Sequence, residues 1–290
     1  MTAPPEPIDL HHESMERVIG SYLIETDDGP ALVDCGPASC LPALRAGLAA
    51  RGVELTDIRH LLLTHIHLDH AGGTGALVRE QPALQVHVSE VGAPHLVDPS
   101  RLERSARRLY GDRFDHLWGD LAPVPEANVR VTGDRVLGLE AFASPGHASH
   151  HACYLATDGT LFAGDATGIR IQPARHLVPA TPPPDIDLEA WRKTFAEIER
   201  RFPARVALTH FGVADDVDWH ISEARAMLEL WAERVSGDMD EHQFTAAARW
   251  DLTATDEPVA PYYQHAAPFQ LSYAGLRRYW DKRAEREGSG

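Results

Sequence analysis

The sequence predicts an α/β protein built from two strand-rich halves that are followed by a helical block. Two observations carry this prediction: runs typical of strands recur in two successive groups with helical spacings between them, and only helical spacings are found near the end of the chain. Such alternation is typical of sheets whose outer faces are covered by helices. We therefore expect residues 1–213 to form the main domain and residues 214–290 to form a helical appendage packed on it.

The first half begins with a hairpin, because residues 18–34 hold two β-rich runs around Asp28 and Gly29. An Asp-Gly pair is typical of a two-residue hairpin turn. Apolar runs and helical spacing then predict the next elements. They are a helix over 39–51 that ends near Gly52, a buried strand at 61–63, a helix over 71–80, a strand at 85–88 and a helix over 100–116.

The second half returns to short strands, and the appendage is helical. Strands are expected at about 128–131, 135–143, 152–157, 160–163 and 206–208. Apolar residues spaced three or four apart predict a helix over 188–201 and another from Ile221 to Val235. A further helix is expected over 269–286.

Charge excludes several classes of partner. The 290 residues include 27 Lys and Arg against 43 Asp and Glu, which gives a formal net charge of −16. Binding to a phosphate backbone or to an anionic membrane depends on clustered basic side chains, so neither nucleic acid nor a membrane is an expected partner. The chain also holds 17 histidines.

The cysteines and the first residues indicate a cytoplasmic protein. Cys35, Cys40 and Cys153 are odd in number and form no C-x-x-C pair, which favours a reducing compartment and inert thiols. The N-terminal residues are polar and rich in proline, without the apolar region of a signal peptide. No stretch approaches the ~20 apolar residues of a membrane span.

The histidines gather in the segment from Thr64 to His70, directly after a predicted buried strand. In extended backbone, residues two apart point to the same side, so His65 and His67 can converge on one ion. A turn after them lets Asp69 and His70 reach a second ion nearby. Imidazole and carboxylate ligands suit Zn, Fe, Mn or Ni, and the cluster contains no thiolate.

Three later segments repeat one pattern, in which a strand end is followed by a residue that can bind metal. They supply His147 after residues 140–143, Asp165 after residues 161–164, and His210 after residues 206–208. Ligands at strand ends are held by rigid elements, as a metal site requires.

Over about residues 17–213 the sequence resembles the metallo-β-lactamase superfamily, whose signature is H-x-H-x-D-H followed by a later His, Asp and His. The resemblance implies an αββα four-layer sandwich and a site for two divalent metal ions, zinc first, with iron or manganese as alternatives. By position, His65, His67 and His147 would hold one ion. Asp69, His70 and His210 would hold the other, and Asp165 would bridge both.

The acid at Asp165 separates this chain from lactam-hydrolysing members that have a cysteine ligand there. In this respect it is similar to the glyoxalase II, lactonase, phosphodiesterase and tRNA-processing branches. The glutathione-binding motif of glyoxalase II cannot be matched residue by residue in 214–290, and the long basic arm of the tRNA-processing branch is not found.

The resemblance implies a hydrolase for a small-molecule ester, thioester, lactone or related bond. A metal-bridged hydroxide would attack, and Asp69 and Asp165 would orient the water. Two alternatives remain open: an iron-dependent oxidoreductase on the same ligands, and a non-catalytic metal-binding module.

Residues around the metal ligands are less defined by the sequence. His150 and His151 are candidates for orienting the ligands from behind. Substrate contacts are not identified, although residues 95–125, residues 168–187 and the appendage are the candidate pocket elements. Tyr22, Tyr262, Tyr263 and Tyr273 are candidates for a phenol that meets the leaving group. The appendage is compatible with a homodimer or with packing inside one chain.

Overall fold

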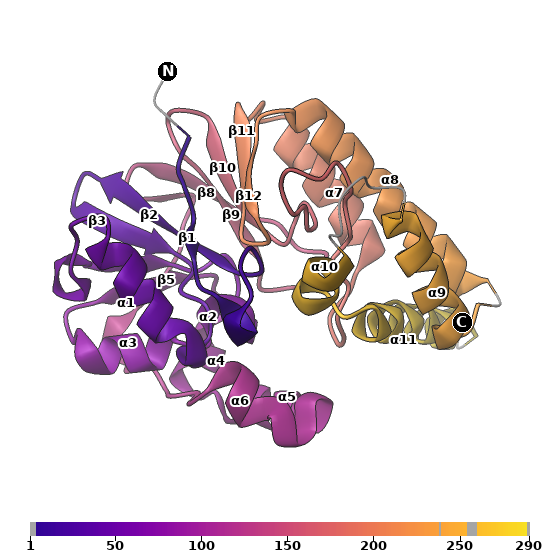
Figure 1. The fold of residues 1–290 in the computed structure, drawn as a ribbon, viewed down its shortest axis with the longest axis horizontal. Helices are drawn as coiled ribbons and strands as arrows, with labels where there is room; N and C mark the ends of the chain where they lie inside the picture. Colours follow the sequence, from indigo (N-terminus) through magenta and orange to yellow (C-terminus); the bar gives the residue numbers. More distant parts are fainter. Residues whose placement is uncertain (1–3, 238, 254–259, 289–290) are drawn as a thin grey trace.

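The computed structural model describes residues 4–237, 239–253 and 260–288. In this part of the chain, two sheets of six strands lie between helices (Figure 1). The strand order is β1-β2-β3-β4-β5-β6 in the first sheet and β12-β11-β10-β9-β8-β7 in the second. The αββα sandwich with a C-terminal helical region is therefore confirmed.

The first sheet comes from the first half of the chain. Its predicted hairpin pairs Thr26 with Gly29, and the later strands are added in parallel. The elements are β1 (Ile8–Asp9), β2 (Gly20–Thr26), β3 (Gly29–Val33), α1 (Leu41–Ala49), β4 (His60–Leu62), α2 (Leu68–Ala71), α3 (Thr74–Glu80), β5 (Gln85–Val88), α4 (Ala93–Val97), α5 (Ser100–Tyr110), α6 (Phe114–Trp118) and β6 (Val129–Val131).

The second sheet and the helical region follow. β12 continues this sheet through Ala214, one residue beyond the boundary that the sequence suggested. The elements are β7 (Arg135–Val136), β8 (Leu139–Ala143), β9 (Ala152–Leu155), β10 (Thr160–Gly164), α7 (Leu188–Glu199), β11 (Arg205–Leu208), β12 (Gly212–Ala214), α8 (Val217–Ser236), α9 (Glu241–Leu252), α10 (Ala260–Ala266) and α11 (Phe269–Gly288).

The four layers follow from the alternation of side chains along the strands. In β4, Leu61 packs among the residues of α1 and α3, whereas Leu62 faces the other sheet. In β10, Leu161 packs toward α7 and α8, whereas Phe162 faces the first sheet. The inner faces of the two sheets therefore share one buried layer, and each outer face packs against helices.

Two expected elements are divided in the structure. The single strand expected over 135–143 is wrong, because Leu137 and Gly138 have φ values of +50° and +85° and turn the chain between β7 and β8. The helix expected over 100–116 is also interrupted, because Gly111 ends α5 with a φ of +55°. Positive φ is not compatible with continued strand or helix.

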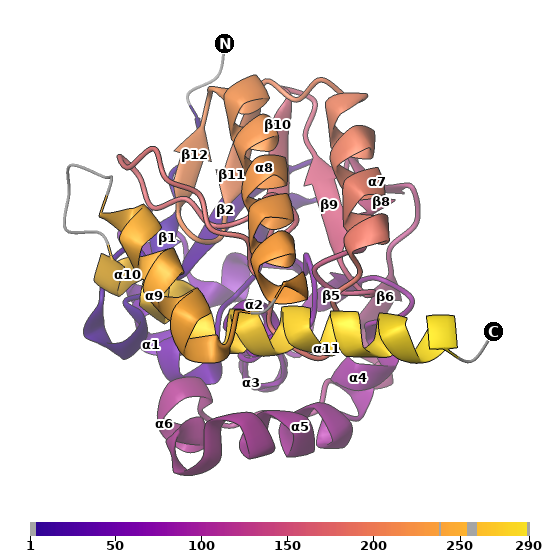
Figure 2. The ribbon, with the colours of Figure 1, turned by 90° about the vertical axis from the view of Figure 1, so that its right-hand side faces the viewer.

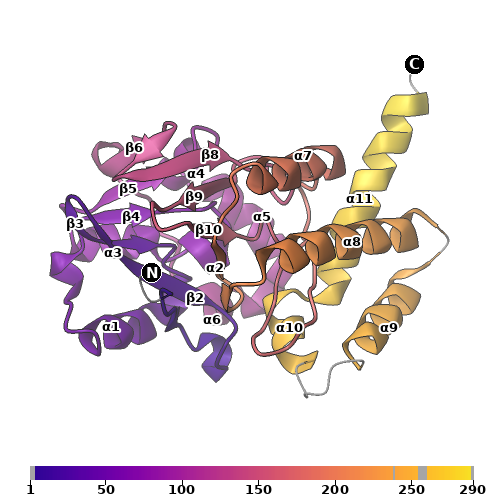
Figure 3. The same ribbon diagram turned by 90° about the horizontal axis from the view of Figure 1, so that it is seen from above.

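The helices after β12 share their core with the second sheet. Trp231 of α8 and Phe269 of α11 belong to the same buried cluster as Leu208 of β11. Figure 2 shows α8 running beside α7 in front of the second sheet, and α11 crosses below the lower end of α8. Figure 3 shows the same packing from above. Among the described residues, no helix is both long and apolar enough to cross a bilayer.

Candidate metal centre

All seven predicted metal ligands meet at one place, where strands of the two sheets end. The segment from His65 to His70 follows β4, His147 follows β8, and Asp165 and His210 follow the parallel strands β10 and β11. Three overlapping sets cover all seven residues, and within each set the ligand atoms lie within 4.8 Å of one another: His65, His67 and His147; His65, His70 and Asp165; and Asp69, His70 and His210. The sequence therefore identified the residue types, and the packing of two sheets brings them together.

The first group consists of three histidine ring nitrogens. Nδ1 of His67 lies 3.0 Å from Nε2 of His65 and 2.8 Å from Nε2 of His147, and the two Nε2 atoms are 3.2 Å apart. Zinc–nitrogen bonds of about 2.0–2.1 Å at tetrahedral angles place ligand nitrogens about 3.3 Å apart. The triangle is therefore close to the size that one metal ion requires.

The second group combines Asp69, His70 and His210. Oδ2 of Asp69 lies 3.4 Å from Nε2 of His210 and 3.8 Å from Nε2 of His70. Asp69 keeps 22% of its side chain exposed, whereas both histidines are buried. The carboxylate of Asp69 is thus the part of this group that faces the solvent-accessible side.

Asp165 lies between the two groups. Its Oδ1 is 3.3 Å from Nε2 of His70 and 3.6 Å from Nε2 of His210, and its Oδ2 is 3.4 Å from Nε2 of His147. Oδ1 and the two facing nitrogens are buried without a hydrogen-bond partner. Unpaired buried polar atoms are costly. A cation would satisfy all three atoms, so these residues fit a bound metal.

Hydrogen bonds behind the ligands aim their free nitrogens at the centre. Nδ1 of His147 donates to the carbonyl of Ala180 at 2.7 Å, and Nδ1 of His210 donates to the carbonyl of Val18. Nδ1 of His70 donates to Oδ2 of Asp34 at 2.7 Å. Because the proton is held at Nδ1, the lone pair of each Nε2 points to the metal position.

Asp34 is the functional residue that the sequence analysis missed. Its carboxylate also accepts hydrogen bonds from the amide and the hydroxyl of Thr64, each at 2.8 Å, and from the hydroxyl of Thr209 at 3.2 Å. It is buried, and it stands directly after β3 with a φ of +53°. The sequence signal that could have identified Asp34 is an acidic residue directly after a strand.

The two groups differ in charge. Burial lowers the pKa of His65 and of His67 well below the ordinary value, and neighbouring imidazoles lower both further. For His70, burial acts in the same direction, but the charges of Asp165, Asp69 and Asp34 outweigh it and raise the pKa well above the ordinary value. The first group is therefore neutral near pH 7, whereas the second group holds the carboxylate of Asp69 and adjoins that of Asp165, and both complement a cation.

Comparison with known proteins agrees with this geometry. The model of the metallo-beta-lactamase superfamily matches residues 16–211, which include all seven ligands. The chain belongs to the metallo-beta-lactamase superfamily. Its similarity to individual members is lower, and the matched regions span between 38% and 63% of the curated relatives' own lengths.

Two curated relatives and one solved structure illustrate this similarity. A probable metallo-hydrolase of Mycobacterium tuberculosis is 31% identical over 200 residues, which cover 55% of this chain and 63% of that protein. A hydroxyacylglutathione hydrolase of Chromohalobacter salexigens is 31% identical over 146 residues, or 50% of this chain and 46% of that protein. A superfamily protein of Sulfolobus tokodaii has a TM-score of 0.67 at 18% identity, covering 96% of this chain and 99% of that one.

His150 and His151 lie behind the metal ligands, but neither forms a hydrogen bond with the ring of His147. His151 shares a hydrogen bond of 2.7 Å with the hydroxyl of Ser144, and its Nε2 accepts the amide N–H of Asp165 at 3.2 Å. His150 places its ring 5.3 Å from that of His67. His151 thus orients the backbone at Asp165, and His150 packs against the first group.

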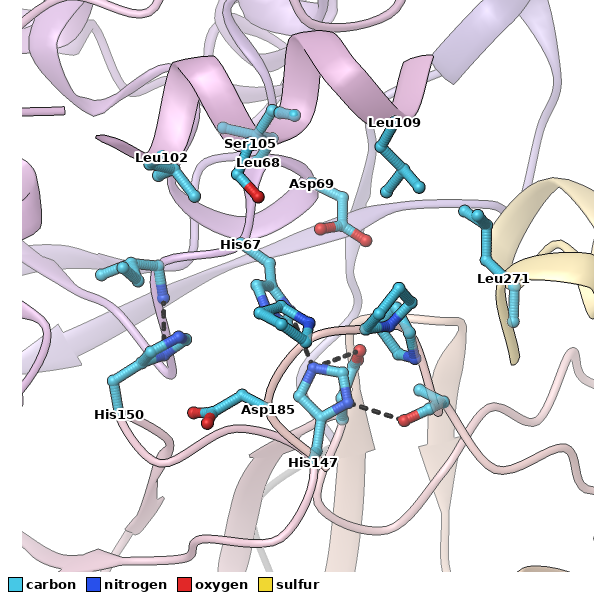
Figure 4. Close-up of a pocket in the computed structure, with 18 of the residues that line it drawn as sticks. His67, Leu68, Asp69, Leu102, Ser105, Leu109, His147, His150, Asp185 and Leu271 are labelled. Atoms are coloured by element: carbon cyan, nitrogen blue, oxygen red, sulfur yellow. Dashed lines mark hydrogen bonds and ion pairs between the residues drawn. The ribbon is translucent and has the colours of Figure 1, made fainter. Parts of the chain in front are cut away.

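A cavity of about 480 Å³ opens over the metal centre. Its volume is within the size range of small-molecule sites. Its walls come from the three elements that the sequence suggested: residues 95–118, residues 180–185 and residues 266–272. Figure 4 shows Leu102, Ser105 and Leu109 on one side of His67 and Asp69, with Leu271 on another. Among the described residues, the four candidate tyrosines do not line this cavity, whereas Tyr110 does.

Proposed function

We propose that this protein is a dinuclear metal-dependent hydrolase that cleaves an ester, thioester, lactone or related bond of a small molecule. The observation that carries the proposal is the position of Asp165, whose two oxygens face two different groups of ligands. One carboxylate between two imidazole groups is suited to two neighbouring divalent cations. Zinc is the first expectation, and iron or manganese also suit these ligands.

Each residue has a distinct task in this proposal. His65, His67 and His147 would hold one ion, Asp69, His70 and His210 the other, and Asp165 both. Two bound cations would supply Lewis acidity and a water with a lowered pKa. The side chain of Asp69 is partly exposed at the cavity, so its carboxylate can orient that water and accept its proton. Asp34 keeps the ring of His70 fixed during the reaction.

Two further observations support a hydrolase. One relative carries the name hydroxyacylglutathione hydrolase, which denotes a hydrolase in that protein. The cavity of about 480 Å³ above the ligands gives a substrate direct access to Asp69 and His67. A purely metal-storing or scaffolding module does not need such a cavity.

Elemental analysis tests the assignment of the metal centre. The wild-type protein is expected to bind two metal ions, whereas His67→Ala and Asp165→Ala are expected to retain one or none. His87→Ala is the matched control, because His87 is a half-buried histidine that contacts His60 on β4 instead of the centre. Retention of both ions in His67→Ala and Asp165→Ala would contradict the assignment.

The reaction is tested on protein of known metal content with a panel of esters, thioesters, lactones, lactams and phosphodiesters. Turnover with redox-inert zinc supports hydrolysis. Substrate-dependent oxygen uptake with iron alone favours an iron-dependent oxidoreductase. Absence of turnover on the whole panel favours a non-catalytic metal-binding module.

A further inference from the structure

The metal centre lies between two cavities, of which the second has the larger share of polar lining. The first, described above, is bordered by His67 and His147 of the first ligand group. A second cavity of about 450 Å³ is bordered by His210 of the second group. Asp69 and Trp118 line both cavities. A molecule bound at the two metal positions can therefore extend into both cavities.

The first cavity is mainly apolar. Leu102 and Leu109 of α5 border it at the top of Figure 4, and Leu271 of α11 borders it at the right. Val91 and Leu109 keep 52% and 41% of their surface exposed, and both line this cavity. Exposed large apolar side chains around a site indicate an apolar ligand.

The lining of the second cavity is also more apolar than polar, but polar groups make up a larger share of it than in the first cavity, and a buried histidine borders it. His12 belongs to a short 3-10 helix (His12–Ser14) and is only 4% exposed. Its Nε2 donates to the carbonyl of Leu117 at 3.1 Å, and its ring stacks on Trp118 with 5.4 Å between centroids. Its Nδ1 is buried without a hydrogen-bond partner. A neutral imidazole that donates through Nε2 has a free acceptor at Nδ1.

Arg113 and His265 border the second cavity, and both are already paired with Glu13. Arg113 donates to Oε1 of Glu13 at 2.7 Å, and Nδ1 of His265 lies 3.2 Å from Oε2 of the same residue. Burial lowers the pKa of His12, although its bond to Leu117 and the charge of Asp69 oppose this effect. The second cavity therefore suits a neutral group that donates a hydrogen bond, and it does not suit a polyanion.

The backbone around His12 is held in an uncommon conformation. His11, Glu13 and Ser14 have φ values of +48°, +51° and +64°. Non-glycine residues with positive φ are strained and are concentrated at functional sites. The bonds of Glu13 to Arg113 and His265 hold this segment against the second cavity.

We propose that the substrate is a neutral amphiphilic ester or thioester that lies across the metal centre. Its apolar acyl group occupies the first cavity, and its polar leaving portion occupies the second, where Nδ1 of His12 accepts a hydrogen bond. This rests on the proposed hydrolase function. Water adds its hydroxyl to the acyl carbon, the bond to the leaving oxygen or sulfur breaks, and the proton ends on that leaving atom.

A two-dimensional substrate series tests this orientation with the metal-loaded protein. The 2-hydroxyethyl and ethyl esters of acetic, butanoic, hexanoic and octanoic acid are compared. We expect kcat/KM to rise up to about fourfold per added methylene. We also expect each hydroxyethyl ester to exceed its ethyl ester about fivefold, because only the former donates a hydrogen bond. A flat acyl series, or equal rates for the two alcohols, overturns the proposal.

Variants of His12 assign the hydroxyl preference to Nδ1. In His12→Gln, the amide nitrogen can still donate to Leu117, but the acceptor at Nδ1 is lost. We expect the hydroxyethyl preference to disappear while the dependence on acyl length persists. His12→Asn places an amide oxygen near the position of Nδ1 and is expected to restore part of the preference. Unchanged preference in a folded, metal-loaded His12→Gln overturns the role of His12.

Two valines provide a matched pair for the acyl side. Val91 and Val131 are 52% and 57% exposed, but only Val91 lines the first cavity. Val91→Asp is expected to reduce the advantage of octanoyl over acetyl esters at least tenfold, and Val131→Asp is expected to preserve it. Equal behaviour of the two variants contradicts an acyl group in the first cavity.

A binding measurement separates this proposal from the hydrolase proposal. N-(2-hydroxyethyl)octanamide and N-(2-hydroxyethyl)acetamide are titrated calorimetrically into the metal-loaded protein. We expect the octanamide to bind at least fiftyfold more tightly, and we expect His12→Gln to weaken its binding. Tight binding of the octanamide without turnover of any ester would refute the hydrolase proposal but not the amphiphilic ligand. Turnover of esters without this binding preference would refute the amphiphilic substrate but not the hydrolase proposal.

Discussion

Nδ1 of His70 donates a hydrogen bond of 2.7 Å to Oδ2 of Asp34, and both side chains are almost completely buried. This bond joins the end of β3 to the second group of metal ligands. Asp34 also accepts hydrogen bonds from Thr64 and Thr209, the residues that directly precede His65 and His210. One carboxylate therefore fixes two of the segments that carry ligands, the segment from Thr64 to His70 and the segment of Thr209 and His210.

Asp34→Asn is expected to weaken binding of the second metal ion about 10- to 100-fold, because His70 loses its charged partner. Competition with a chromophoric chelator measures this affinity. Asp28→Asn is the control, since the exposed Asp28 makes a similar bond of 2.8 Å with His60 away from the centre. Equal metal affinities of the two variants would show that the bond does not orient the ligand.

Gly146→Ala is expected to lower the free energy of unfolding by about 2–3 kcal/mol. Gly146 has a φ of +138°, and a Cβ atom there would lie 2.3 Å from Cβ of Trp191. His147 is the next residue, so its metal group should also lose affinity. Urea unfolding and elemental analysis measure both effects. Gly133→Ala is the control, because its added Cβ would meet no atom within 4 Å; comparable losses in both variants would contradict the prediction.

Acid is expected to destabilise the protein partly through His220. Burial and the nearby Arg170 lower the pKa of His220 from 6.5 to about 4. The folded state thus binds this proton less well than the unfolded state, so stability is retained above pH 6.5 and declines as the pH falls toward 4. Protonation of His220 lowers the free energy of unfolding by up to about 3 kcal/mol in total.

His220→Asn removes this titration. Its free energy of unfolding should fall less steeply between pH 6.5 and 4.5 than that of the wild type, as measured by urea unfolding at each pH. His242→Asn, at an exposed position on α9, should keep the wild-type slope. Parallel curves for His220→Asn and the wild type would rule out this contribution.

Tyr263→Phe is expected to loosen residues 169–178. The phenol of Tyr263 accepts the amide N–H of Ile171 at 3.1 Å and donates to the carbonyl of His176 at 2.6 Å. Loss of both bonds leaves a buried amide unpaired, at a cost of about 1–3 kcal/mol. Hydrogen exchange of this segment should accelerate.

Tyr262→Phe is the matched control for Tyr263→Phe. Tyr262 contacts Arg17 through its ring face at 4.8 Å, and phenylalanine keeps that face. Exchange in residues 169–178 should therefore match the wild type. The same acceleration in both variants would show that the phenol of Tyr263 does not hold this segment.

The sequence by itself determined the fold class and the choice of candidate ligands. Hydrophobic periodicity is local, so β5 matches its prediction and α7 agrees within two residues. The ligand segment from His65 to His70 is also local, and its side chains converge at the end of β4. Turns set by single residues, such as Leu137 and Gly111, were missed because a positive φ at one position leaves little trace in the hydrophobic pattern.

Only the tertiary structure decided which residues surround those ligands. Asp34 and His70 are 36 positions apart, and His12 and Leu117 are 105 positions apart. No local spacing relates such pairs, because their contacts arise only when segments far apart in the sequence pack together. The chemistry of the metal centre is therefore encoded in short segments, whereas its orientation and the two cavities beside it depend on how distant segments fill space together.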